Sequence, residues 1–302
     1  MIKRILGNLY FLTFLNGFLL ASLFYFKMEG NYEKELFAAI RSNVDKDVNF
    51  DDTDDSIVVK VLHVCNTLLN SRASIFGSQD LDGFKVNYIQ PTSIDLMTAR
   101  GACGSYAIVL ARTLQDYKYP VRIAQMKAHG VYAAHNIVEV KTRNGWVVLD
   151  PLFNVYFSKP GNQGLANFED VHKDWNYYKT QVPANYDLNY KYEGVRYSNW
   201  TKIPVLMPAV KKMLDLILGK EKADTISIRT YFLRMYDVYF FLTFFFFLPI
   251  FIFTVSRLIK TKVFPKPEIP LTFTNIFKYS KARLSHASID TEINTTQPHS
   301  LS

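Results

Sequence analysis

The chain has 302 residues, a formal net charge of +8, 49% hydrophobic residues and 15% aromatic residues. The positive charge forms no long basic stripe, so flanks of membrane helices explain it better than nucleic-acid binding, which we exclude. Two cysteines, Cys65 and Cys103, are too few for a disulfide framework, and a single bridge between them is the only disulfide alternative. The length accommodates one larger domain or two ordinary ones.

The first apolar segment covers residues 5–26 and follows Lys3 and Arg4. As a helix it would be about 33 Å long, which is sufficient to cross a bilayer core. A cleaved signal peptide is the competing interpretation, but it requires a shorter apolar region and small residues at its end. Residues 24–26 are Phe, Tyr and Phe, so we expect an uncleaved transmembrane helix at 5–26.

A polar helix is expected at 29–41, followed by an acidic loop at 45–55. This loop lacks the Gly and the terminal Glu of a calcium-binding EF-hand, so we expect Asp54 or Asp55 to cap the next helix instead. That helix covers 56–71 and has apolar residues at helical spacing. Cys65 lies on its apolar face, which predicts an inert core cysteine.

The centre of the chain predicts helices followed by strands. A short helix at 94–98 leads to a second helix that begins at Cys103 and ends near Tyr117. The pattern then changes to strands at 121–126, 135–140 and 146–150, with a hairpin signal at Asn144-Gly145. A helix followed by a meander of strands predicts an α+β fold with an antiparallel sheet.

Residues 153–200 are rich in Tyr, Asn and Pro and show little periodicity. The stretch from Tyr177 to Tyr197 is a candidate peptide or glycan cleft, with ordinary packing of a loop-rich flank as the alternative. A helix at 208–218 is amphipathic, which suits either a membrane interface or packing on the domain.

The second apolar segment, residues 238–256, would be about 28 Å long as a helix, and Pro249 inside it does not prevent membrane spanning. Basic residues follow at once: Arg257, Lys260, Lys262 and Lys266. The positive-inside rule therefore places both termini in the cytosol and residues 27–237 outside it, in a double-pass protein of the cell membrane. Residues 257–302 are expected to be a basic, partly disordered cytosolic tail.

Three residues form a candidate catalytic site. A cysteine at a helix N-terminus favours the thiolate, the nucleophilic form, and Gly101 and Gly104 leave room beside it. His135 opens a strand and Asp150 ends the neighbouring one, about equally far from the hairpin turn. We expect their side chains to meet on one face of the sheet. If the helix of Cys103 packs on that face, the cysteine reaches the same place. Histidine would then serve as base and acid, and the carboxylate would orient it.

Residues 93–157 resemble the transglutaminase-like core of the papain-like superfamily. The resemblance is carried by the blocks GACGSYA at 101–107, YPVR at 119–122, HNIVEV at 135–140 and GWVVLDP at 145–151. It implies Cys103 as nucleophile, His135 as general base and acid, and Asp150 as the residue that orients the histidine. Ile137 departs from the pattern, because the family usually carries Trp there. The implied architecture is a papain-like core, at about 56–157, flanked by two transmembrane helices.

These observations predict a membrane-anchored cysteine enzyme that acts on amide bonds through a thioester, either as a protease or amidase or by acyl transfer to an amine. A catalytically silent binding or assembly module of the same fold is the alternative. The expected partners are a peptide, protein or amide-bearing glycan substrate and the membrane, without nucleic acid. We expect no cofactor and no metal, since His129 and the other ligand-type residues lack zinc spacing. The oxyanion donors would be the backbone N–H of Cys103 and either Asn87 or Gln90.

Overall fold

A computed structural model describes residues 8–128 and 130–263, so His129, Lys266 and most of the predicted tail lie outside the described residues. The chain divides into two compact units. The larger unit covers residues 17–247, and the smaller one joins the two ends of the chain, up to Asn16 and from Leu248. All the predicted site residues belong to the larger unit.

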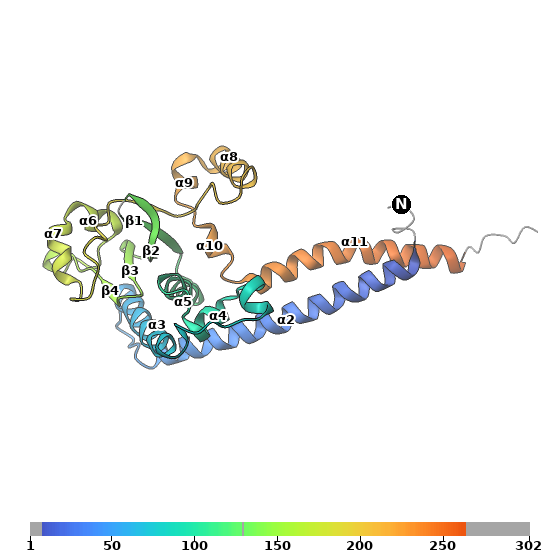
Figure 1. Ribbon diagram of the computed structural model, residues 1–302, viewed down its shortest axis with the longest axis horizontal. Coiled ribbons are helices and arrows are strands. Elements are labelled where there is room, and N and C mark those ends of the chain that lie inside the picture. The colour runs from blue at the N-terminus through green and yellow to red at the C-terminus, as the bar shows by residue number, and fades with distance from the viewer. Residues whose placement is uncertain (1–7, 129, 264–302) are drawn as a thin grey trace, which may run out of the picture. The chain divides into compact units, whose positions relative to one another are not determined.

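The larger unit contains a five-stranded antiparallel sheet, which confirms the predicted α+β class (Figure 1). Its strands are β1 (Val121–Ala128), β2 (Val131–Thr142), β3 (Gly145–Asp150), β4 (Val155–Tyr156) and β5 (Val195–Arg196). Their order across the sheet is β4-β3-β2-β1-β5. Arg122 and Glu139 pair across β1 and β2, with Nε and Oε2 2.8 Å apart.

The β2–β3 hairpin turns one residue earlier than the sequence signal suggests. Thr142 pairs with Gly145, so the two loop residues are Arg143 and Asn144. Gly145 has a φ of 119°, a value that L-residues rarely adopt, and this explains why glycine stands at the first position of β3.

Helices cover one face of this sheet. α3 (Asp54–Phe76), α4 (Thr92–Thr98) and α5 (Cys103–Asp116) pack there together with the C-terminal part of α2. The shared core includes Val138, Val140 and Leu149 from the strands, and Cys65 lies in it without exposed surface, as predicted. Thr53, rather than Asp54 or Asp55, caps α3 by accepting a hydrogen bond from the Ser56 N–H, because both aspartates already lie in the first turn.

Residues 157–192, called the Tyr-rich segment from here on, cover the opposite face. This segment contains α6 (Phe168–Lys173) and α7 (Trp175–Tyr178), and its aromatic side chains pack on Ala124, Ile137 and Val148. The remaining short helices are η1 (Lys85–Ile89), η2 (Pro160–Asn162), η3 (Lys179–Gln181), α9 (Lys220–Asp224) and α10 (Ile228–Tyr231). The sheet is therefore the middle of three layers.

Two long apolar helices pack against each other, α2 (Leu9–Asp45) and α11 (Met235–Val263) (Figure 1). Both are long and apolar enough to span a membrane, and only 11% and 6% of their apolar windows are buried, unlike core helices of soluble proteins. In the smaller unit, Asn16 Nδ2 donates to Thr254 Oγ1 across 2.8 Å. The described parts of the predicted helices at 5–26 and 29–41 both belong to α2, but the predicted boundary between them is wrong: no break occurs there, and α2 continues until Asp45.

The amphipathic segment forms α8 (Leu206–Leu218), close to the predicted 208–218. None of its residues is buried, and Leu206, Met213, Leu216 and Ile217 are exposed. On its polar side, Lys211 pairs with Asp215 and Asp224 and lies over the Trp200 ring.

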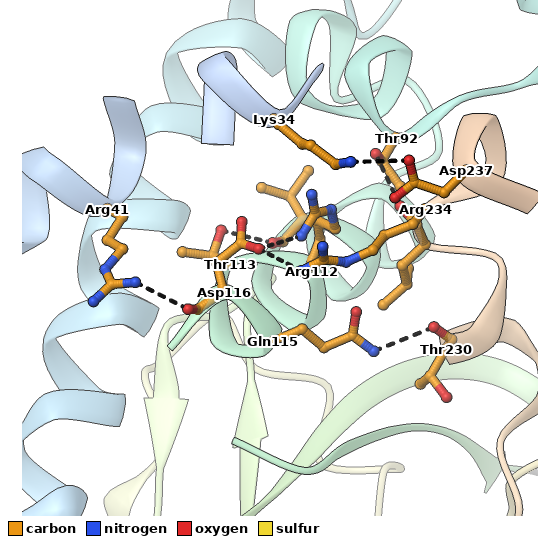
Figure 2. Close-up of polar contacts among 12 residues, drawn as sticks. Lys34, Arg41, Thr92, Arg112, Thr113, Gln115, Asp116, Thr230, Arg234 and Asp237 are labelled. Atoms are coloured by element: carbon orange, nitrogen blue, oxygen red, sulfur yellow. Dashed lines mark hydrogen bonds and ion pairs between the residues drawn. The ribbon is translucent and has the colours of Figure 1, made fainter. Parts of the chain in front are cut away.

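The C-terminal end of α5 is tied to α2, to α10 and to Arg234 just before α11 (Figure 2). The Asp116 carboxylate pairs with Arg112, whose side chain is 1% exposed, and with Arg234 Nη2 at 2.7 Å. Arg41 on α2 donates to the Asp116 carbonyl at 3.0 Å, and Gln115 Nε2 donates to the Thr230 carbonyl at 3.2 Å. This network fixes the helix that begins at Cys103 from its far end.

Replacing Asp116 by Ala should destabilise the protein by about 3 kcal/mol or more, because it leaves the buried Arg112 guanidinium without its counter-ion. Urea unfolding of the full chain in detergent micelles measures this effect. As a control, Glu169→Ala removes the exposed pair with Lys173 and should cost no more than about 1 kcal/mol. Equal stabilities of the two variants would contradict the role of Asp116.

Candidate active site

Cys103 is the first residue of α5, as the sequence predicts, and it is half-buried. The preceding Ala102 has a φ of 44°, a left-handed value that costs a non-glycine residue conformational energy. Strain of this kind concentrates at functional sites. Gly104 faces open space, whereas a Cβ at Gly101 would lie 2.7 Å from Ser105 Oγ. Only Gly104 therefore leaves room beside the sulfur.

The Gly101 turn is held by a buried carboxyl group. The Gly101 N–H donates to Ser105 Oγ at 2.8 Å, and the Ser105 hydroxyl donates to Asp95 Oδ1 at 2.6 Å. Burial raises the pKa of Asp95. This chain of hydrogen bonds fixes the loop that delivers Cys103 to the helix.

His135 and Asp150 meet, as expected from the hairpin. His135 Nε2 lies 2.7 Å from Asp150 Oδ2, and both side chains are fully buried. Asp150 Oδ1 accepts hydrogen bonds from the N–H groups of Leu152 and Phe153, at 3.2 and 3.5 Å. Because Nε2 is occupied by the carboxylate, Nδ1 is the ring nitrogen left to face Cys103.

α5 does not pack on the face of His135 and Asp150, so the condition under which the sequence predicts that Cys103 reaches them is not met. Side chains alternate along a strand, so these two residues share the face of Ile137 and Val148, which the Tyr-rich segment covers. Asn136 points to the other face, toward α5, and its Nδ2 lies 3.2 Å from Cys103 Sγ. Cys103 therefore interacts with two neighbouring residues of β2 that lie on different faces of the sheet, His135 and Asn136.

Arg229 fixes the orientation of the Asn136 amide. Its Nη1 donates to Asn136 Oδ1 at 3.1 Å. Because a guanidinium only donates, the oxygen of the amide faces Arg229 and the NH₂ group faces the sulfur. Arg229 lies 93 residues from Asn136 in the chain, and no sequence pattern connects them.

The electrostatics of the site favour an ion pair. Burial alone would raise the pKa of Cys103, but hydrogen bonds with His135 and Asn136 outweigh it and lower this pKa below 9.0. Burial disfavours the charged form of His135, yet the Asp150 carboxylate raises its pKa to about 9. The hydrogen bonds to the sulfur therefore favour the thiolate, and the Asp150 carboxylate favours the imidazolium.

Three tyrosines of the Tyr-rich segment surround the histidine and the carboxylate. Tyr190 stacks on the His135 ring, with centroids 4.6 Å apart and planes 7° from parallel. The Tyr186 hydroxyl donates to Asp150 Oδ2 at 3.0 Å and lies 3.2 Å from that of Tyr192. Burial raises the pKa of Tyr186, so its hydroxyl stays protonated and donates. This segment therefore supports the site in addition to packing on the sheet.

The sequence missed Asn136, Arg229 and these tyrosines. Asn136 was identifiable in principle, because it follows the histidine and must point to the opposite face. The sequence candidates for the second oxyanion donor, Asn87 and Gln90, both line a cavity beside the Gly101 turn. Asn87 Nδ2 donates to Asp82 Oδ1. The side-chain amide bonded to Cys103 is instead that of Asn136.

The two cysteines differ sharply. Both are free, so the Cys65–Cys103 bridge does not form. Burial raises the pKa of Cys65 to about 12, which makes it inert at neutral pH.

Among the described residues there is no cluster of three His, Cys, Asp or Glu side chains that could hold a metal ion. Comparison of the chain with protein-family models, curated protein sequences and solved structures finds no significant match.

The ion pair predicts how the rate of Cys103 alkylation by iodoacetamide depends on pH. The rate should rise at a pH below that of an ordinary thiol, because the pKa of Cys103 is lowered. Asn136→Ala and His135→Ala each remove a hydrogen bond to the sulfur and should move this rise to higher pH. A tenfold weaker thiol acid carries about tenfold less thiolate at neutral pH. Mass spectrometry of labelled peptides measures both cysteines, with buried Cys65 as the internal control. A rise at the same pH in all three proteins would contradict the assignment.

Proposed function

We propose that the protein is a membrane-anchored cysteine enzyme that cleaves or transfers acyl groups from amides through a thioester at Cys103. The observation that supports this best is the pairing of buried His135 with Asp150 beside a half-buried cysteine of lowered pKa. A structural core cysteine would be expected to have a raised pKa, as Cys65 does.

In this mechanism, the Cys103 thiolate attacks the amide carbon and the carbonyl oxygen becomes an oxyanion. His135 then transfers its proton to the leaving amine, and the C–N bond breaks to give a thioester. The Asp150 carboxylate stabilises the imidazolium and fixes the ring, so that Nδ1 stays directed at the reacting atoms. Water, activated by the now neutral His135, hydrolyses the thioester, or an amine takes the acyl group.

The oxyanion forms on the carbon that becomes bonded to Sγ. Its oxygen requires hydrogen-bond donors that point toward it. The backbone N–H of Cys103, at the start of α5, is one candidate. We assign the second role to Asn136 Nδ2 in place of Asn87 or Gln90, since it already lies 3.2 Å from the sulfur. Arg229 keeps this amide in the donating orientation before the substrate arrives, and such preorganisation is what gives oxyanion donors their effect.

The order of the three residues on a helix start and two adjacent antiparallel strands supports the transglutaminase-like assignment proposed from the sequence blocks. Ile137, where that family usually carries Trp, is buried among the aromatic residues of the Tyr-rich face. An aromatic ring next to the histidine is supplied here by Tyr190, from a different part of the chain.

Acyl-enzyme formation tests the function directly. The full chain, in detergent micelles, should release p-nitrophenol from p-nitrophenyl acetate in a burst and carry the acetyl group on Cys103 by mass spectrometry. A primary amine such as glycinamide should accelerate loss of the acetyl group if the enzyme is a transferase. Cys103→Ala should abolish the burst, and Asp150→Asn should slow it by about a hundredfold or more, because the histidine loses its orienting carboxylate.

Tyr177→Phe serves as the matched control, because Tyr177 is partly exposed and lies in the Tyr-rich segment without contacting the histidine. It should leave the burst unchanged. If the wild type and Cys103→Ala release p-nitrophenol equally, the chain is a silent binding or assembly module and the enzymatic proposal is wrong.

The membrane topology is part of the proposal: α2 and α11 each cross the membrane, both termini face the cytosol and the sheet lies outside it. Basic residues in the last turns of α11 and after it, and before α2, support this orientation. Epitope tags at both termini should resist protease in intact cells, whereas a tag inserted at Gly83, an exposed residue between α3 and η1, should be cleaved. Cleavage of either terminal tag in intact cells would overturn the two-span arrangement.

A further inference from the structure

A cavity of about 530 Å³ lies beside the first turn of α5. Gly101 and Gly104, which flank Cys103 in the chain, line it, and so does Arg229, whose partner Asn136 contacts the sulfur. A Cβ at Gly104 would meet nothing within 4 Å, so the cavity wall is open at the residue next to Cys103. Cys103 is not itself a lining residue, and Asn136 and Arg229 connect its sulfur to the cavity.

The cavity has positively charged groups on two of its walls. Arg229 and Arg100 line it, and the only carboxyl group among its described lining residues is Asp95. Asp95 is already hydrogen-bonded to Ser105, and burial raises its pKa although the charge of Arg229 opposes this shift. Arg100 pairs with Asp80, but that aspartate is 96% exposed and so neutralises the guanidinium only weakly.

Arg229 also retains hydrogen-bonding capacity. Among the described residues its guanidinium makes one hydrogen bond, from Nη1 to Asn136 Oδ1. A guanidinium has five N–H donors in a planar fork, so the others can bind a planar anion while Asn136 stays in place. Asn87 and Gln90, also on the cavity wall, add amide groups to the same space.

We propose that this cavity binds a carboxylate on the acyl part of the substrate, so that the enzyme selects acyl donors with an acidic group close to the reacting carbonyl. This inference rests on the proposed function, because it assigns the cavity to the group that becomes bonded to Cys103. Arg229 then has two roles, orienting Asn136 and binding the anion, and Arg100 contributes to the second alone.

Two alkylating reagents that differ only in charge test the proposal. Iodoacetate and iodoacetamide both react by attack of Sγ on the CH₂ carbon, forming an S–C bond and releasing iodide. The first places a carboxylate beside the sulfur and the second a neutral amide. The rate with iodoacetate is divided by the rate with iodoacetamide, first for Cys103 and then for glutathione. The ratio for Cys103 divided by the ratio for glutathione reports selectivity for the anion. Both reagents meet the same thiolate, so changes in its nucleophilicity cancel.

In the full-length wild type this normalised ratio should be about ten, because one charge-assisted hydrogen bond has an effect of this size. Arg229→Gln and Arg100→Gln should each bring it toward one, and Arg229→Lys should retain most of it. Arg143→Gln is the matched control: it removes the same charge from an exposed side chain at the β2–β3 turn and should leave the ratio unchanged. Arg100→Gln keeps the test available if Arg229 variants fail to fold, because the Arg100 guanidinium bonds to loop atoms of Asp80 and Leu81 rather than to the core.

The outcomes separate the two proposals. Fast labelling of Cys103 with a ratio equal to that of glutathione, or a high ratio that both Arg→Gln variants leave intact, contradicts the anion site alone. Labelling of Cys103 that is slow with both reagents, at the rate of a buried thiol, contradicts the proposed function and with it this inference.

Discussion

The site depends on the contact between His135 and Asp150, which is buried on both sides and 2.7 Å long. An unpaired carboxylate at this depth would be strongly destabilising, so its oxygens are satisfied by four donors: His135, Tyr186 and the backbone N–H groups of Leu152 and Phe153. These donors leave the histidine ring one orientation. Because Nε2 is committed to Asp150, everything else in the site, including the direction of Nδ1 and the stacking of Tyr190, follows from this pair.

The alternation of side chains along β2 explains how one cysteine is contacted by two neighbouring residues. His135 lies on the face covered by the Tyr-rich segment, and Asn136 lies on the helical face. A helix start placed at the end of the strands can meet both. The two faces therefore supply different functions to the proposed reaction: the Tyr-rich face holds the proton-transfer pair in a dry environment, and the helical face holds the amide and guanidinium groups that respond to negative charge.

Local patterns predicted the parts of the fold that depend on local interactions. Strand periodicity and the hairpin signal predicted β1 and β3 to within two residues of their ends, and the glycines around Cys103 marked the start of α5. The prediction that His135 opens a strand is wrong, because β2 already begins at Val131. The predicted helix boundary between residues 26 and 29 was wrong. The polarity of the sequence changes there but its helix propensity does not, so α2 continues. Arg229 and Tyr190 could not be predicted as site residues. Their positions depend on how segments without periodicity fold back on the sheet, which no spacing in the chain encodes.

The contacts that the residues around the start of α11 make with α2 and with the core also determine when the larger unit can fold. Lys34 on α2 pairs with Asp237 on α11 across 203 residues of sequence, and the core requires Leu233, just before α11. Such distant contacts form only after the closing segment has left the ribosome. The part of the core that Leu233 covers therefore stays open until the chain has been synthesised beyond that residue. A chain interrupted before residue 233 would expose this part of the core, and apolar surface of this kind is what chaperones and quality-control proteases recognise.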